Sequence, residues 1–168
     1  MSAVRESHAA PVRAASRPRL TALVSAWAPV ALWLAVIFSL SGDRFSDVNT
    51  AVWLSGMPLV GALLPPAAIE VGNFIVRKCA HFVEYAVLGM LTFRALRSTR
   101  PRVRKRQLLA VAVGLAVLCA SLDELRQFLA TFTRSGTPRD VLLDGTGALA
   151  GALVGATYLY RRSQRGDA

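Results

Sequence analysis

The segment "ALVSAWAPVALWLAVIFSL", residues 22–40, decides the fold class because it contains no charged side chain. A helix needs about 20 residues to cross a hydrocarbon core about 30 Å thick, and this segment has that length. The apolar run is longer than the roughly 7–15 residues of a cleaved signal peptide, and no A-x-A cleavage motif follows it. The segment therefore predicts a retained membrane helix.

Three further apolar blocks follow, at about residues 75–96, 108–122 and 141–160, and the second of these extends towards Leu129. Short polar links separate the blocks, and 54% of the 168 residues are hydrophobic. Long apolar runs of this kind are typical of polytopic helical membrane proteins. The sequence therefore predicts an all-α bundle of four transmembrane helices.

This bundle is expected to form one domain over residues 21–162, preceded by a disordered basic N-terminus, 1–20, and followed by a tail, 163–168. The net charge is +10. Thirteen basic residues lie in the two termini and the link 97–106, whereas four lie in the remaining links. The positive-inside rule then predicts that both termini are cytoplasmic in a multi-pass plasma-membrane protein. Membrane lipids are the partners expected for these basic links, and nucleic acid is not.

Three of the predicted helices carry polar side chains at the same depth. With cytoplasmic termini, the second and fourth helices begin outside and the third ends outside, so their polar residues meet near the outer surface. An ionisable group costs about 2.5–3.5 kcal/mol at the centre of a membrane helix, so such groups face a bundle interior and find partners. The residues concerned are Lys78, His81, Glu84, Asp123, Glu124, Gln127, Asp140 and Asp144.

Residues four apart share a helix face, which groups several of these side chains. The segment "GTGALAGALVG", residues 145–155, contains two G-x-x-x-G steps, which we interpret as surfaces for close helix packing. The polar pairs at this spacing are His81 and Tyr85, Asp123 and Gln127, and Asp140 and Asp144.

The link "TFTRSGTPRD", residues 131–140, leads into the fourth helix. Its glycine and proline predict a turn, and Thr137 or Asp140 is suited to cap the helix that follows. Arg134 and Arg139 lie beside the carboxylates in the sequence, so we expect them to pair with acidic groups or to bind substrate.

The segment 43–74 is predicted to lie outside. It is too apolar for a solvated loop and is interrupted by Pro58, Pro65 and Pro66. One interpretation is a segment that lies on the outer interface, with Trp53 as an anchor, or dips back as a lid over the polar residues. The other is a simple amphipathic connector, and the sequence does not separate the two.

Three segments in this order, "RKCAHFVEYAVLGML", "SLDELRQ" and "TRSGTPRDVLLDGTGALAGALVG", resemble the VanZ-like membrane proteins over roughly residues 25–160. Two positions depart from the family pattern. Asp144 stands where the family commonly has Asn, and Arg126 stands where His often precedes the Gln. The pattern carries over to Lys78, His81, Glu84, Tyr85, Asp123, Glu124, Gln127, Arg134, Gly136 and Asp140.

The resemblance implies a small multi-pass membrane protein. It also implies a link to glycopeptide resistance, because the founding member is associated with low-level resistance to teicoplanin. The family supplies no settled reaction. The expected substrate is therefore a class only: a lipid-linked cell-wall precursor or another component of the bacterial cell envelope.

One hypothesis is an outward-facing catalytic or headgroup-binding site. His81 would exchange protons, since an imidazole titrates near neutral pH, and Glu84 or Asp123 would orient it. Lys78 and Arg134 would hold a phosphate or carboxylate. Asp140 and Glu124 would position the loop or bind a metal. Gln127 completes the set assigned to catalysis, and Tyr85, Arg139 and Asp144 are assigned to substrate binding.

Two hypotheses without catalysis remain. In the first, the protein is a sensor or scaffold, and Lys78 and Arg134 neutralise the buried carboxylates of a structural network. In the second, it is a small transporter, which would require oligomers. No compact metal motif is present around His81, so neither a metal nor a cofactor is predicted. Cys79 and Cys119 are interpreted as buried structural thiols.

Overall fold

The computed structural model describes residues 20–42, 47–130 and 137–166, and in these ranges every regular element is a helix. The N-terminus expected to be disordered and Arg134 lie outside the described residues. The helices are α1 (Leu20–Leu40), α2 (Asp47–Ser55), α3 (Pro58–Leu63), α4 (Pro66–Thr99), α5 (Lys105–Ala130) and α6 (Pro138–Gly166).

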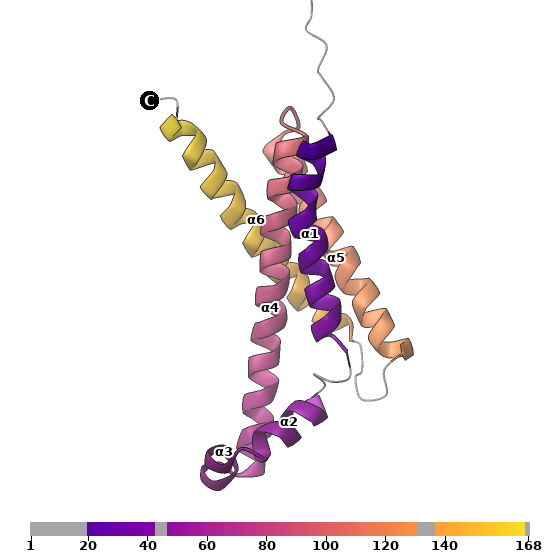
Figure 1. The fold of residues 1–168 in the computed structure, drawn as a ribbon, viewed down its shortest axis with the longest axis vertical. Helices are drawn as coiled ribbons and strands as arrows, with labels where there is room; N and C mark the ends of the chain where they lie inside the picture. The colour runs from indigo at the N-terminus through magenta and orange to yellow at the C-terminus, as the bar shows by residue number, and fades with distance from the viewer. Residues whose placement is uncertain (1–19, 43–46, 131–136, 167–168) are drawn as a thin grey trace, which may run out of the picture.

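Four of these helices, α1, α4, α5 and α6, are long and apolar enough to cross a membrane. The predicted all-α bundle of four transmembrane helices is therefore confirmed. In Figure 1, α1, α4 and α5 run roughly side by side, and α6 crosses them obliquely. Helices α2 and α3 lie beyond one end of the bundle, against the N-terminal part of α4.

The expected start of the second membrane helix, near residue 75, is wrong, because α4 already begins at Pro66. Two of the prolines that were taken as breaks instead start helices: Pro58 is the first residue of α3 and Pro66 is the first residue of α4. Pro138, which was expected in a turn, is the first residue of α6. Proline suits the first helical position because the N–H that it lacks would have no partner there and its φ angle is already helical. Residues 66–74 therefore belong to a helix and not to a loop.

The α4–α6 interface is built by small residues that let the two backbones touch. A Cβ atom added at Gly151 would lie 1.7 Å from the Ala86 carbonyl oxygen, and one added at Gly147 would lie 2.4 Å from the Phe82 carbonyl oxygen. From the other side, a Cβ at Gly89 would lie 2.1 Å from the Ala148 carbonyl oxygen. The interpretation of the glycine steps as packing surfaces is therefore confirmed.

Buried alanines continue this packing along α5 and α6, and each row of alanines ends in carboxylates. On α5 the row at four-residue spacing leads to Glu124, and on α6 it starts from Asp144. Because these acids occupy the core-facing row, the helix faces that pack the bundle also turn the acids inward. The buried alanines are Ala112, Ala116 and Ala120 on α5, and Ala148, Ala152 and Ala156 on α6.

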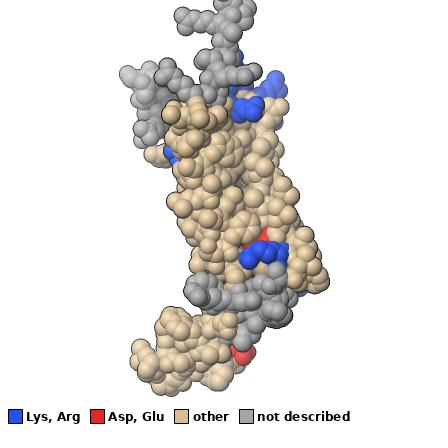
Figure 2. Space-filling view, turned by 45° about the vertical axis from the view of Figure 1, so that its right-hand side comes forward, with Lys and Arg blue, Asp and Glu red and all other residues tan. Residues whose placement is uncertain are grey.

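Figure 2 shows where charge lies along the bundle. Lys and Arg side chains gather at one end, an uncharged belt follows, and a second charged group lies at the other edge of this belt. At the basic end, Arg97 and Lys105 lie over the ring of Tyr160, 5.2 and 4.9 Å from its centroid. An aromatic ring beneath cations is typical of a membrane–water interface.

Candidate functional site

The second charged group lies at one edge of the apolar belt. On α4, nineteen positions separate Lys78 from Arg97, which corresponds to about 28 Å of helix. This distance is close to the thickness of a hydrocarbon core, about 30 Å. If Arg97 marks one membrane interface, Lys78 and its neighbours lie at the other interface, where lipid chains end and headgroups begin. Helix α4 continues for about 18 Å beyond Lys78 to Pro66.

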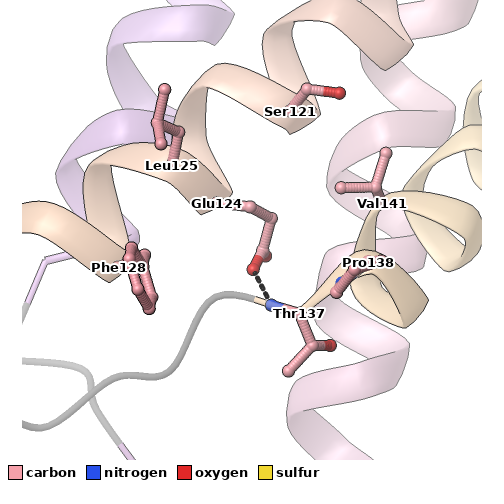
Figure 3. Close-up of a pocket in the computed structure, with 7 residues that line it drawn as sticks. All are labelled: Ser121, Glu124, Leu125, Phe128, Thr137, Pro138 and Val141. Carbon is pink, nitrogen blue, oxygen red and sulfur yellow. Dashed lines mark hydrogen bonds between the residues drawn. The ribbon is translucent and has the colours of Figure 1, made fainter.

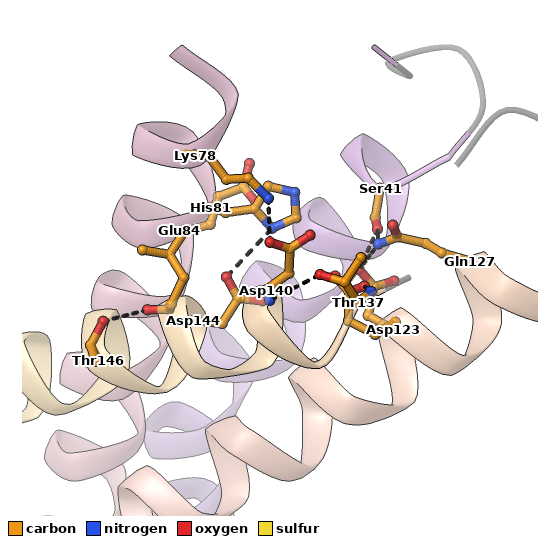
Figure 4. A network of polar contacts seen from close by, with 12 residues as sticks. Ser41, Lys78, His81, Glu84, Asp123, Gln127, Thr137, Asp140, Asp144 and Thr146 are labelled. Atoms are coloured by element: carbon orange, nitrogen blue, oxygen red, sulfur yellow. Dashed lines mark hydrogen bonds and ion pairs between the residues drawn. The ribbon is translucent and has the colours of Figure 1, made fainter. Parts of the chain in front are cut away.

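One half of the polar cluster joins α4 to α6 (Figure 4). The Lys78 ammonium group donates to the Asp140 carboxylate and forms an ion pair with it. One turn along both helices, His81 Nδ1 lies 3.5 Å from Asp144 Oδ1. The Asp144 side chain is only 1% exposed and that of His81 is 14% exposed, whereas Lys78 keeps a third of its side chain accessible. This half therefore contains the His81–Asp144 pair, whose contact atoms are buried, and the more accessible Lys78 ammonium group one turn away.

The other half joins the end of α1 to α5. The Ser41 hydroxyl donates to the buried Asp123 carboxylate, and Gln127 Nε2 donates to Ser41 Oγ (2.7 Å) and to Asp123 Oδ2 (2.9 Å). The Arg126 guanidinium lies 3.0 Å from Asp123 Oδ1 and also donates to the Phe38 carbonyl oxygen at 3.4 Å. Asp123 therefore accepts bonds from α5 and from the residue that follows α1, and these bonds fix the C-terminal end of α1 against α5.

Glu124 connects the two halves. Its Oε2 accepts a hydrogen bond from the Thr137 backbone N–H at 2.7 Å, just before α6 begins. The Thr137 hydroxyl accepts a bond from the Asp140 N–H at 3.3 Å, so Thr137 is the cap of α6. Figure 3 shows Glu124 in a groove of about 360 Å³ between α5 and α6. Glu124 therefore positions the start of α6, as expected for a residue that holds the loop.

The roles expected of several residues change in the structure. Glu84 or Asp123 was expected to orient His81, but Asp144 is the carboxylate in contact with it. Glu84 lies three residues further along α4, and its backbone carbonyl oxygen accepts a hydrogen bond from Trp33 of α1. The spacing rule did not exclude Glu84, because residues three apart on a long helix can face different neighbours.

The residues assigned to substrate binding also differ in access. Tyr85 is only 1% exposed and packs in the core, so no substrate reaches it without a rearrangement. Arg139 is exposed, and Asp144 is buried beneath His81. Cys79 is exposed on α4, contrary to the expectation of a buried thiol, and Cys119 is half-buried.

Three residues that bond within or beside the polar cluster were not predicted from the sequence. Ser41 directly follows the uncharged block 22–40, and its position at the end of a membrane helix gave no indication of a partner on another helix. Arg126 was noted only as a departure from a pattern, yet it pairs with Asp123. Trp33 donates from Nε1 to the Glu84 carbonyl oxygen at 2.8 Å. A tryptophan in the middle of a membrane helix is the one signal that could have indicated a buried donor in need of an acceptor.

Comparison with known proteins gives one match. Residues 26–159 match the VanZ/LLP1 family over most of the chain. The chain belongs to the VanZ/LLP1 family. No curated protein and no solved structure matches it.

The two positions that were expected from the sequence to depart from the family pattern both lie in ion pairs in this VanZ/LLP1 protein. Asp144 faces His81, and Arg126 faces Asp123. The first departure adds a negative charge to the α4–α6 half, and the second adds a positive charge to the α1–α5 half. Each added charge has a partner within its own half of the cluster.

The His, Asp and Glu side chains of the polar cluster are of the types that bind metal ions. Within residues 20–42, 47–130 and 137–166, no three His, Cys, Asp or Glu side chains are arranged to hold a metal ion. His81 contacts Asp144, while Glu124 is engaged with the Thr137 backbone. The arrangement of these groups is that of paired charges, which suits recognition of a polar headgroup and proton exchange at His81.

Proposed function

We propose that this VanZ/LLP1 protein binds the polar headgroup of a lipid-linked cell-envelope substrate at the outer face of the plasma membrane, and thereby contributes to glycopeptide (teicoplanin) resistance. The observation that carries the proposal is the pairing of a buried His81–Asp144 contact with a partly exposed Lys78 at the edge of the apolar belt. A buried network that served only to hold helices together would not require an accessible cation.

Charge and depth support an anionic headgroup as ligand. The Lys78 ammonium group carries three donors, and a third of the side chain remains accessible beside its contact with Asp140. A phosphate or carboxylate could replace Asp140 at this ammonium group or share it. His81 lies one turn further into the bundle, where it could donate to the same ligand or accept a proton from it.

The outward orientation is part of the proposal and rests on the distribution of basic residues. Thirteen Lys and Arg residues lie in the termini and the link 97–106, and the described members Arg97 and Lys105 lie at the end of the bundle opposite to the site. If these residues face the cytoplasm, the polar cluster faces outside, where glycopeptides act on cell-wall precursors.

A second candidate function is a scaffold or sensor without catalysis. The observation that favours it is the complete pairing of Asp123, which accepts from Ser41, Arg126 and Gln127 and leaves little capacity for a ligand. In this case the cluster would fix helix positions, and removal of one partner would leave a buried charge that destabilises the fold.

The test compares His81→Ala and Asp144→Asn with wild type in two measurements. These are teicoplanin susceptibility in a sensitive bacterial host, and thermal unfolding of each purified protein in detergent. Thr157→Ala serves as the control, because Thr157 is exposed on α6 and far along the helix from the cluster.

Loss of resistance with unchanged unfolding temperature would support a working site. A parallel loss of both would assign the cluster to structure and reject the headgroup site. Wild-type protein that gives no resistance would remove teicoplanin from the proposal. The headgroup site would then be tested by binding of phosphate-bearing lipids to the same variants.

A further inference from the structure

The search for further sites leads to the gap between α1 and α5. Helix α1 packs on α4 but has few close backbone approaches to α5 or α6. At their outer ends the two helices are joined through Ser41 and Asp123. Deeper in the bundle they leave a crevice of about 250 Å³.

The crevice is apolar and has a defined shape. Helix α1 forms one wall with Trp27, Val30, Ala31 and Leu34, and α5 forms the other with Leu115, Ala116 and Cys119, while Leu88 and Thr92 of α4 form the floor. Water finds few hydrogen-bond partners in such a space, so it is suited to hydrocarbon.

Its depth places the crevice directly beneath the polar cluster. Cys119 is four residues from Asp123 on α5, and Leu34 is seven residues from Ser41 on α1. These separations correspond to about 6 and 10 Å along the helices. The crevice therefore begins about 6–10 Å below the polar cluster, a distance that part of one hydrocarbon chain covers, and continues towards the middle of the membrane.

We propose that this crevice holds one hydrocarbon chain of the lipid whose headgroup binds at the polar cluster, which makes the ligand an amphiphile bound from the membrane. The inference rests on the headgroup site proposed above and defines its substrate class: an anionic lipid whose chain is attached directly at the headgroup level. The volume is below the roughly 300–1,000 Å³ of pockets that enclose a whole ligand, so the crevice takes part of a single chain.

Continuity with the polar cluster distinguishes this chain from the lipids that surround any membrane protein. Exposed side chains elsewhere on the bundle, such as Val154 and Leu153 of α6, face lipid on a surface that no second helix encloses. In the crevice, two helices and a floor restrict a chain.

The test uses two photoactivatable lipids with the same diazirine-bearing acyl chain. One is phosphatidic acid, and the other is diacylglycerol, which lacks the phosphate. The full chain is reconstituted in phosphatidylcholine vesicles with each probe, irradiated, and digested for mass spectrometry. Labelling at Leu115 and Cys119 is compared with labelling at exposed α5 residues outside the crevice, Leu118 and Leu122.

Two tryptophan variants of α1 form a matched pair. Ala31→Trp fills the crevice, whereas Ala28→Trp adds the same side chain at an exposed position that does not line it. We expect phosphatidic acid to label Leu115 and Cys119 in wild type and in Ala28→Trp, with loss of this labelling in Ala31→Trp. Equal labelling of all four α5 positions, unchanged by Ala31→Trp, would overturn the proposal and indicate surrounding lipid only.

Comparison of the two probes separates this inference from the headgroup site. If the phosphate binds at the cluster, phosphatidic acid labels the crevice more than diacylglycerol does, and Lys78→Met removes the difference. Labelling that is lost in Ala31→Trp but equal for both probes would support the crevice as a chain site. The same result would contradict both the headgroup proposal and the anionic character assigned to the ligand.

Discussion

The α4–α6 contact and the α1–α5 contact differ in how two membrane helices are joined. Between α4 and α6, glycines bring the backbones together along several turns, and charge pairs extend the contact at one end. Between α1 and α5, side-chain hydrogen bonds join the C-terminal ends of the two helices, and a crevice separates the helices deeper in the bundle. Lipid provides no hydrophobic force between helices, so close packing and polar bonds must hold the helices together. The α4–α6 contact is therefore held mainly by backbone packing, and the α1–α5 contact mainly by polar bonds.

The largest effect is expected from Gly151→Ala. The added Cβ atom would lie 1.7 Å from the Ala86 carbonyl oxygen, and a backbone atom cannot move aside without separating α4 from α6. We expect a destabilisation above the roughly 1–3 kcal/mol of ordinary overpacking. Thermal unfolding in detergent measures it.

Gly114→Ala is the matched control, because a Cβ at Gly114 of α5 meets no atom within 4 Å. This variant should be neutral, or more stable by up to about 1 kcal/mol, because alanine is the better helix former. Equal unfolding temperatures for the two variants would show that α4 and α6 are not in backbone contact.

A smaller effect is expected from Asp123→Ala, which removes the acceptor shared by Ser41, Arg126 and Gln127. Loss of one partner from a buried pair costs about 3–5 kcal/mol, and the partial exposure of Arg126 places this case at the lower end. The Ser41–Asp123 bond would be lost, and the α1–α5 contact would rest on the weaker set of bonds from Gln127 to Ser41 and from Arg126 to Phe38, while the α4–α6 interface stays intact.

The measurement for Asp123→Ala is maleimide labelling of Cys119 in a Cys79→Ser background, together with thermal unfolding. Cys119 lines the crevice and is half-buried, so its labelling should accelerate when α1 moves away. Asp123→Asn, which keeps an acceptor for Ser41, should retain more of the protection. Unchanged labelling in Asp123→Ala would mean that the Ser41–Asp123 bond does not hold α1 against α5.

The smallest effect is expected from Trp33→Phe, which removes the hydrogen bond from Nε1 to the Glu84 carbonyl oxygen between α1 and α4. Such bonds in membrane proteins contribute about 0.6 kcal/mol on average and up to about 1.7 kcal/mol. Trp53→Phe on the exposed face of α2 is the control. A loss in the control as large as that in Trp33→Phe would assign the effect to ring size and not to the hydrogen bond.

Much of the fold could be predicted from the sequence because membrane helices are recognised by length and apolar composition. The block 22–40 lies within α1, and the pairs Asp123 with Gln127 and Asp140 with Asp144 share faces as their spacing indicates. Thr137 was one of the two predicted caps, and it accepts the Asp140 N–H. The start of α4 was placed too late because Pro65 and Pro66 were taken as a break and not as the beginning of a helix.

The partners within the site required the tertiary structure. Helix periodicity places His81 on a face but does not say which neighbouring helix that face meets, so Asp144 could not be chosen over Glu84 or Asp123. Ser41 and Arg126 enter the cluster only because α1 ends beside the last turns of α5.

The sequence by itself determined that the chain crosses a membrane, how many times it does so, and that its polar residues gather at one depth. These properties follow from local composition and from the 1.5 Å rise of the helix, which act within each segment. Only the tertiary structure decided which charges pair, that glycine brings α4 against α6, and that α1 stands apart from α5 to leave a crevice. These depend on how helices distant in sequence approach one another, and the approach is set by side-chain shapes on both surfaces at once.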